Sequence, residues 1–164
     1  MAAVAAADVD DFARPAEVGE LVVVAVEAAR EVVRVAEAVL RGLSARDTAA
    51  LRPLLLPEVS LTSVANPARP RGPVSIQDAS TFFRTLPNGS DALRERMWSP
   101  SVALYGGIAM VHTPYDFHVN GKFSHCGTDV FTLVKSPGGR WRVAQVAYTV
   151  HPTGCAPSPL GPPT

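Results

Sequence analysis

The sequence has no excess of charge of either sign and no cluster of basic residues. Its 15 lysine and arginine residues are dispersed along the chain and are balanced by 15 acidic residues. A nucleic-acid-binding surface needs basic side chains gathered on one face. The composition therefore argues against a nucleic-acid partner. It is that of an ordinary globular protein, with 47% hydrophobic residues.

Cysteine is scarce. Cys126 and Cys155 are too few for a disulfide framework, and they do not form the paired spacing of a zinc site. We therefore expect two free thiols in a reducing compartment and a cytoplasmic location.

Long apolar runs are also missing. The apolar residues 21–26 lie between Glu20 and Glu27 and are too few to cross a bilayer. The N-terminal residues lack the basic region of a secretory signal, and their acids argue against a transit peptide. We expect no membrane partner.

The length of 164 residues fits one domain with a proper core. The Ala-rich residues 1–14 and the Pro-rich residues 154–164 are typical of disordered tails. We therefore expect a single folded domain over 15–153, and the sequence contains no internal repeat.

The first part of this domain has helical periodicity. Apolar residues recur at three- and four-residue steps from Leu21 to Val39, which predicts a helix over 15–41. Ser44 is the expected cap of a second helix that stops before Pro57.

Strands and one short helix are expected next. Residues 59–64 alternate like a strand, and the prolines of 66–73 indicate a loop. Ser75 is the expected cap of a short helix. Residues 93–105 then predict a strand that is interrupted at Pro100.

The strongest local signal is Asn120-Gly121, which lies between two runs rich in β-branched and aromatic residues. These runs, 109–119 and 122–134, predict a hairpin closed by a two-residue type I′ turn. The turn pairs Val119 with Lys122, and the other pairs follow by counting outward.

This register gathers titratable side chains on one face of the hairpin, because alternate side chains of a strand point the same way. It places Asp116 opposite His125, and His112 opposite Asp129. A carboxylate at that distance can orient an imidazole and raise its pKa. The two pairs are therefore candidates for acid–base chemistry.

Each candidate also has a structural interpretation. Such pairs across a hairpin are more often structural ties or exposed pairs than catalytic groups. A mid-strand acid such as Asp129 needs a partner if it is buried. Tyr115 and Tyr148 are candidate donors to a substrate carbonyl, whereas Trp98 is either a pocket wall or plain core. The histidines lack a His-x-His spacing, which makes a metal site the weaker interpretation.

The last strand is expected over 141–150, after a turn at 136–139. A four-residue loop would align Asp129 with Val146. A three-residue loop with a bulge would instead exchange the two faces of this strand, and both registers remain open.

Helices followed by a curved antiparallel sheet predict an α+β fold with the helices on one face. The central hairpin is apolar on both faces, and the helices can cover only one of them. We therefore expect a homodimer that packs through the outer sheet face.

Several stretches of the chain resemble the nuclear transport factor 2-like superfamily, which includes the SnoaL-like and ketosteroid isomerase-like branches. The resemblance covers residues 16–153 and is nearest to an uncharacterised lumazine-binding-like branch. It is carried by GLSARDTAALRPLLLPEVSL, TPYDFHVNGKFSHCGTDVFTLVK and GGRWRVAQVAYTV. It implies a cone-shaped curved sheet wrapped around the N-terminal helices, with a pocket at the open end.

The resemblance also implies a small apolar or aromatic ligand, with no cofactor and no metal. Two functions are compatible with it. One is a cofactor-free isomerase, dehydratase or cyclase that works by acid–base chemistry, and the other is a non-catalytic ligand-binding or dimerisation domain.

One departure from the family pattern matters. Ketosteroid isomerase-like members carry a carboxylate base on or just after the first strand, but SLTSVANP (60–67) has no acid. Any base must therefore come from the hairpin. The candidate catalytic residues are Asp129, His112, His125 and Tyr115, and the candidate substrate-binding residues are Trp98, Asp116, Phe131 and Tyr148.

Overall fold

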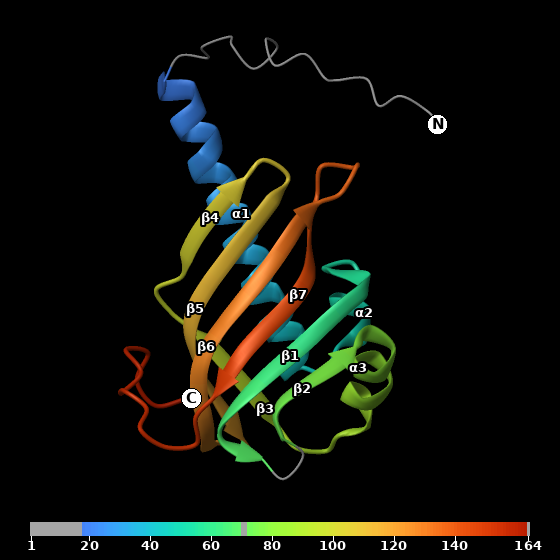
Figure 1. The fold of residues 1–164 in the computed structure, drawn as a ribbon, viewed down its shortest axis with the longest axis vertical. Helices are drawn as coiled ribbons and strands as arrows, with labels where there is room; N and C mark the ends of the chain where they lie inside the picture. The colour runs from blue at the N-terminus through green and yellow to red at the C-terminus, as the bar shows by residue number, and fades with distance from the viewer. Residues whose placement is uncertain (1–17, 70–71, 164) are drawn as a thin grey trace.

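A long helix, α1 (Val18–Ser44), lies against a curved, seven-stranded sheet in the computed structural model, which describes residues 18–69 and 72–163 (Figure 1). Two short helices, α2 (Thr48–Leu51) and α3 (Ala79–Thr85), follow α1 in the chain, and a 3-10 turn, η2 (Leu86–Asn88), follows α3. The predicted α+β class is confirmed. The predicted tail over 1–14 lies outside the described residues.

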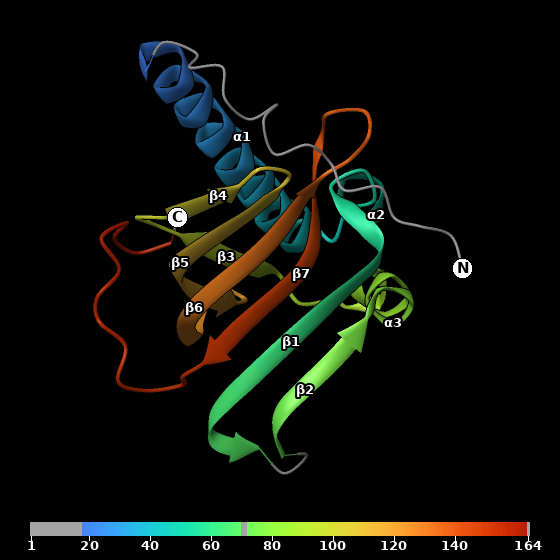
Figure 2. The same ribbon diagram turned by 45° about the horizontal axis from the view of Figure 1, so that its top comes forward.

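The strands are β1 (Leu55–Arg69), β2 (Gly72–Asp78), β3 (Leu93–Met97), β4 (Ser101–Tyr105), β5 (Ile108–Val119), β6 (Lys122–Lys135) and β7 (Trp141–Val150). Their order in the sheet is β2-β1-β7-β6-β5-β3, and β4 also pairs with β5. The described strands pair antiparallel except for β1 and β7, which are parallel. Figure 2 shows how the sheet curves around α1.

The apolar stripe of α1 builds the core. Its buried residues lie three and four positions apart, as the periodicity predicted, and they belong to one cluster with Val111 of β5 and Leu133 of β6. Burial of each such side chain contributes roughly 1.5–3 kcal/mol to folding. The buried residues of α1 are Val32, Ala36, Val39 and Leu40. None of the helices in the described part has the length and apolarity of a membrane span.

Two predicted helix starts are wrong. Asp47, not Ser44, caps α2, since its Oδ1 accepts a hydrogen bond from the Ala50 N–H at 2.9 Å. Asp78, not Ser75, caps α3 by accepting from the Thr81 N–H at 2.7 Å. Aspartate caps as well as serine does, so local sequence alone does not select between neighbouring candidates.

Tertiary pairing also overrides two predicted element ends. The chain is already extended at Leu55, which pairs with Val143 of β7, so that Pro57 lies within a strand. Most of the predicted loop over 66–73 belongs to β1, which continues to Arg69 before β2 returns beside it.

The central hairpin has the predicted type I′ turn. Asn120 and Gly121 both have positive φ angles, 51° and 74°. Val119 pairs with Lys122, and His118 pairs with Phe123, as expected.

Beyond these pairs, β6 contains one extra residue, Ser124, and Phe117 therefore pairs with His125. Every later pair is shifted by one residue, so Thr113 faces Asp129. The predicted pairs of His112 with Asp129 and of Asp116 with His125 are wrong. The shift turns His125 and Asp129 to the inner face of the sheet and leaves the two β5 residues on the outer face.

Two irregularities set the pairing of β7 with β6. Its connection spans five residues rather than four, and a second irregularity lies between Thr132 and Leu133. Asp129 therefore faces Tyr148, and Val146 faces Phe131. Neither predicted register is right, but Val146 and Tyr148 do share a face with Asp129, as the four-residue alternative required.

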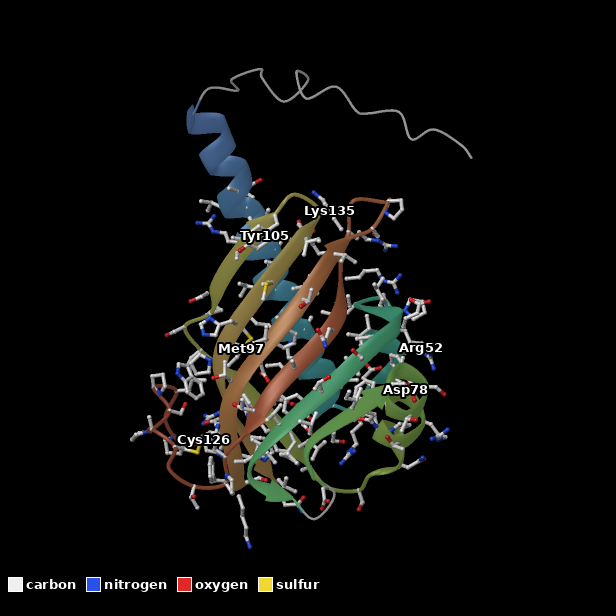
Figure 3. All side chains as sticks on the ribbon, in the orientation of Figure 1. Arg52, Asp78, Met97, Tyr105, Cys126 and Lys135 are labelled. Carbon is white, nitrogen blue, oxygen red and sulfur yellow. A yellow bond between two sulfur atoms is a disulfide. The ribbon has the colours of Figure 1, made fainter. Side chains whose placement is uncertain are left out.

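The prediction of free thiols is wrong, because Cys126 and Cys155 form a disulfide. Cys126 lies beside the C-terminal segment (residues 152–163) on the outer face of the sheet (Figure 3). Arg96 holds the same segment, since its Nη1 donates a hydrogen bond to the Gly161 carbonyl at 2.9 Å. The expected cytoplasmic location was based on free thiols and loses that support. The predicted domain boundary at residue 153 stays a prediction.

We expect Cys155→Ser to lower the free energy of unfolding by about 3 kcal/mol, because the disulfide closes a loop of some thirty residues in the unfolded chain. Urea unfolding under non-reducing conditions measures the loss. Cys126→Ser and the double variant should lose the same amount, since all three remove one bond. Two reactive thiols in denatured, unreduced wild-type protein would contradict this expectation.

Candidate active site

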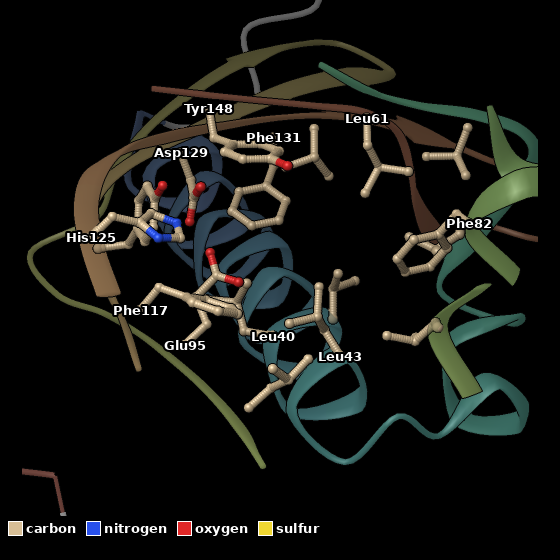
Figure 4. Close-up of a pocket in the computed structure, with 17 residues that line it drawn as sticks. Leu40, Leu43, Leu61, Phe82, Glu95, Phe117, His125, Asp129, Phe131 and Tyr148 are labelled. Carbon is tan, nitrogen blue, oxygen red and sulfur yellow. The ribbon is translucent and has the colours of Figure 1, made fainter. Parts of the chain in front are cut away.

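A cavity of about 270 Å³ lies between α1, α3 and the inner face of the sheet (Figure 4). Most of its wall is apolar and comes from several elements. The labelled apolar side chains are Leu40 and Leu43 of α1, Leu61 of β1, Phe82 of α3, Phe117 of β5 and Phe131 of β6. Such a concave, mainly apolar space with a few polar groups is the usual form of a small-molecule site.

The polar groups gather at one end of the cavity. Glu95 of β3 and Asp129 of β6 point their carboxyl groups toward one another, and the His125 ring lies beside them (Figure 4). Tyr148 of β7 and Tyr115 of β5 line the same cavity. Four strands therefore contribute to one polar cluster.

The two carboxyl groups act on each other. Burial raises the pKa of Asp129 well above its ordinary value, and the Glu95 charge and a hydrogen bond with Glu95 raise it further. Burial also raises the pKa of Glu95, to about 7; the hydrogen bond with Asp129 opposes this rise, and the Asp116 charge adds to it. Asp129 is therefore the donor and Glu95 the acceptor, and the pair keeps a proton at neutral pH.

One oxygen of this pair is unsatisfied. Asp129 is 1% exposed, and its Oδ2 has no hydrogen-bond partner within the described part of the chain. An unpaired buried polar atom is costly, so native proteins rarely keep one without a functional or structural reason. The atom belongs to a residue that lines the cavity, so a polar group of a bound molecule can satisfy it.

The backbone of β3 is fixed to the end of α1. The Glu95 N–H donates a hydrogen bond to Ser44 Oγ at 3.2 Å. Ser44 therefore does not cap a helix but helps to set the position of Glu95.

The aromatic side chains beside the pair are held by packing. His125 stacks on Phe117 with ring centroids 4.9 Å apart, and it meets the edge of Tyr115 at 5.8 Å. The Tyr115 hydroxyl donates to the Thr149 carbonyl at 2.7 Å. Its proton is thus used by the backbone, which weakens the predicted role of Tyr115 as a donor to substrate.

Gly127 makes this packing possible. A Cβ atom at this position would lie 2.0 Å from the Thr149 carbonyl oxygen and 2.8 Å from the Tyr115 ring. Since neither the backbone of β7 nor the buried ring can move away cheaply, only glycine fits here.

The cavity contains five of the eight residues predicted for the site: Asp129, His125, Tyr115, Phe131 and Tyr148. The other three lie elsewhere. His112 is exposed on the outer face, Asp116 is paired there with Arg96 at 2.9 Å, and Trp98 lies at the break between β3 and β4. The Trp98 carbonyl accepts a hydrogen bond from Thr113 Oγ1.

Sequence reasoning missed Glu95. The signal is its place in LRERM, where it alternates with Leu93 and Met97 and so shares their face. An acid at an apolar-face position of a strand has to be paired or functional. Within residues 18–69 and 72–163, no group of three or more His, Cys, Asp or Glu side chains is placed to hold a metal ion.

No protein-family model matches the sequence, and no curated protein matches it significantly. Solved structures do match. An NTF2-like superfamily protein from Salmonella enterica serovar Typhimurium is 19% identical, with a TM-score of 0.61 over 85% of this chain and 99% of that one. An NTF2-like protein of unknown function from Shewanella baltica is 19% identical, with a TM-score of 0.58 over 78% and 97%.

A Nostoc punctiforme protein of unknown function with a cystatin-like fold is 11% identical, with a TM-score of 0.60 over 75% of this chain and 90% of that one. The chain has the nuclear transport factor 2-like fold. At these identities the likeness establishes the NTF2-like architecture, and the activity has to be argued from the site. In this NTF2-like cone, the carboxyl pair and the apolar wall lie between α1 and the sheet.

The raised pKa of Glu95 makes stability depend on pH. Between its ordinary value of 4.5 and about 7, the folded protein binds more protons than the unfolded chain. The free energy of unfolding should therefore fall as pH rises through this window, by more than about 1 kcal/mol from this group. Urea unfolding of the wild type and Glu95→Gln, between about pH 5 and 8, measures the difference.

Glu95→Gln should show the shallower decline, because it removes one of the two raised carboxyl groups. Glu58→Gln, an exposed glutamate of β1, is the matched control and should follow the wild type. Parallel curves for Glu95→Gln and the wild type would contradict the pairing.

Proposed function

We propose that the cavity is the active site of a cofactor-free enzyme that moves a proton on a small, mostly apolar molecule. Isomerisation, dehydration and cyclisation are the reaction classes that such chemistry serves. The observation that carries the proposal is the Glu95–Asp129 pair, which keeps a proton at the end of an otherwise apolar cavity.

The two carboxyl groups have complementary roles. Glu95, with a pKa near neutrality, is the base that removes a proton from the substrate. Asp129, which holds its proton more tightly, is the acid that protonates the leaving or accepting atom. In a dehydration, Glu95 takes the proton from carbon while Asp129 protonates the departing hydroxyl, which leaves as water.

The site resets without a further group. After turnover Glu95 carries the proton and Asp129 is ionised. Because the two carboxyl groups are hydrogen-bonded to each other, the proton passes back between them. The apolar wall keeps water away and so strengthens the electrostatic interactions inside. His125, held against Phe117, orients the substrate beside the pair.

A library of small apolar molecules tests this proposal. Compounds that raise the melting temperature are incubated with the protein, and products are identified by mass spectrometry. Glu95→Gln and Asp129→Asn should fold and lose turnover by about 10²–10⁴-fold, as expected for loss of acid–base assistance. His112→Asn, on the exposed outer face, should keep full turnover.

Binding without turnover in the wild type would instead support the competing function, a non-catalytic ligand-binding domain. Full turnover in Asp129→Asn and Glu95→Gln would place the chemistry outside the pair.

The outer sheet face supports a second part of the proposal, a homodimer. Ile108 and Met110 of β5 are 49% and 41% exposed there. The C-terminal segment lies over the other end of the same face, beside Asp116 and His118. Pairing of two copies through the uncovered end would bury these apolar side chains.

Light scattering should give twice the chain mass of 17.3 kDa, and Met110→Glu should give the monomer because it buries a charge in the interface. Val26→Glu is the control, since Val26 is 42% exposed but lies on α1. A monomeric wild type at about micromolar concentration would contradict the dimer.

A further inference from the structure

The described residues that line the cavity give the carboxyl pair no permanent counter-charge. Among the described residues that line it, none is lysine or arginine. Arg96 adjoins Glu95 in β3, but it is used on the outer face, where Nε and Nη2 bind Asp116 at 2.9 and 2.5 Å. His125 can supply a positive charge only when it is protonated. Glu95 is half-buried, and a negative charge withdrawn from water in this way is costly unless a cation joins it.

The same end of the cavity is rich in aromatic rings. Phe117 and His125 stack on each other, and Tyr115 meets His125 and Tyr148 at centroid distances of 5.8 and 6.4 Å. The faces of such rings attract cations, and the attraction is larger where water is excluded. Aromatic rings combined with a carboxylate are the usual surroundings of a bound ammonium group.

The unpartnered Asp129 Oδ2 completes the set. It is buried in a residue that lines the cavity, and the hydrogen bond to Glu95 leaves this oxygen as an acceptor. An N–H of a ligand cation satisfies it directly. A carboxylate or phosphate ligand would add like charge here, and none of the described lining residues is a lysine or arginine that could receive it.

We infer that the ligand of this cavity is an apolar amine, bound as its ammonium ion with the nitrogen at the Glu95–Asp129 pair. The inference deepens the proposed function and rests on it, because it takes the cavity to be the ligand site. The ammonium charge balances the single negative charge of the pair. The apolar body lies against Leu40, Leu43 and Phe82 in a cavity of about 270 Å³.

The pair keeps its shared proton in this complex. Acid–base chemistry on the bound amine therefore remains available, and no proton has to be supplied from outside. Binding of an amine requires the pair to carry one negative charge. The affinity for an amine should therefore rise with pH until the pair has lost one of its two protons. A neutral ligand that accepts a proton from the pair would show the opposite trend.

Three matched probes test the inference by titration calorimetry at about pH 8, above the pKa of about 7 of Glu95. They are 2-(1-naphthyl)ethylamine, the corresponding alcohol and 1-naphthylacetate. The amine should bind at least about tenfold more tightly than the alcohol, and the acid should not bind measurably. The amine's affinity should fall several-fold when the pH is lowered to about 6.

Variants locate the effect. Glu95→Gln and Asp129→Asn should each weaken the amine by about tenfold or more and leave the alcohol within a few-fold of the wild type. Glu58→Gln should change neither. Leu43→Trp, which fills the apolar end, should weaken both ligands and so assign the binding to this cavity.

Equal affinity for amine and alcohol, or an amine affinity that is unchanged in Glu95→Gln and Asp129→Asn, overturns the amine inference. Tight binding of the alcohol alone overturns it while leaving the cavity as a ligand site, so the proposed function survives. If none of the three probes binds at about 1 mM, the amine inference fails, and the library screen then decides the proposed function separately.

Discussion

One extra residue in β6 determines the chemistry of the cavity. Because side chains alternate between the faces of a strand, Ser124 exchanges the faces of everything beyond it relative to β5. Without this bulge, Asp129 would share a face with His112 and Asp116, and Asp116 would compete for the same space. With it, Asp129 and His125 meet Glu95 inside, while Asp116 meets Arg96 outside. The bulge thus separates the two acids of the hairpin: Asp129 joins Glu95 of β3 in an inner carboxyl pair, and Asp116 joins Arg96 of β3 in an outer ion pair.

The acids on the outer and inner faces of the sheet have different surroundings. On the outer face Asp116 is 5% exposed but bonded to a guanidinium, which is how a structural buried acid is normally satisfied. On the inner face Asp129 is equally buried, yet its neighbour is another acid, and one of its oxygens has no partner in the described chain. Structure alone would favour an apolar residue at this position. An arrangement that costs stability at the wall of a cavity indicates function.

The fold could be predicted because its signals are local and redundant. The periodicity of α1, the Asn120-Gly121 turn and the strand break at Pro100 each need only a few neighbouring residues. The site could be predicted only in part, because the alignment of neighbouring strands decides which side chains face the cavity. A bulge leaves no sequence signature, and one residue decides whether His112 or Glu95 becomes the neighbour of Asp129.

The disulfide was missed for a similar reason. Cys126 and Cys155 are brought together by the pairing of Cys126 with His151 at the end of the last strand, and no spacing rule expresses such a contact. The capping errors have a smaller cause. Asp47 and Ser44, like Asp78 and Ser75, are equally good caps, and only the tertiary structure selects between them.

The parallel pairing of β1 with β7 has a consequence for the order of folding. The last strand lies between the first strand and β6, so the sheet cannot close until the two ends of the domain meet. Contacts between such distant segments carry a high loop-closure cost and form late. The cavity wall includes Leu61 of β1 and Tyr148 of β7. The enclosure of Asp129 is therefore completed only when these two strands pair.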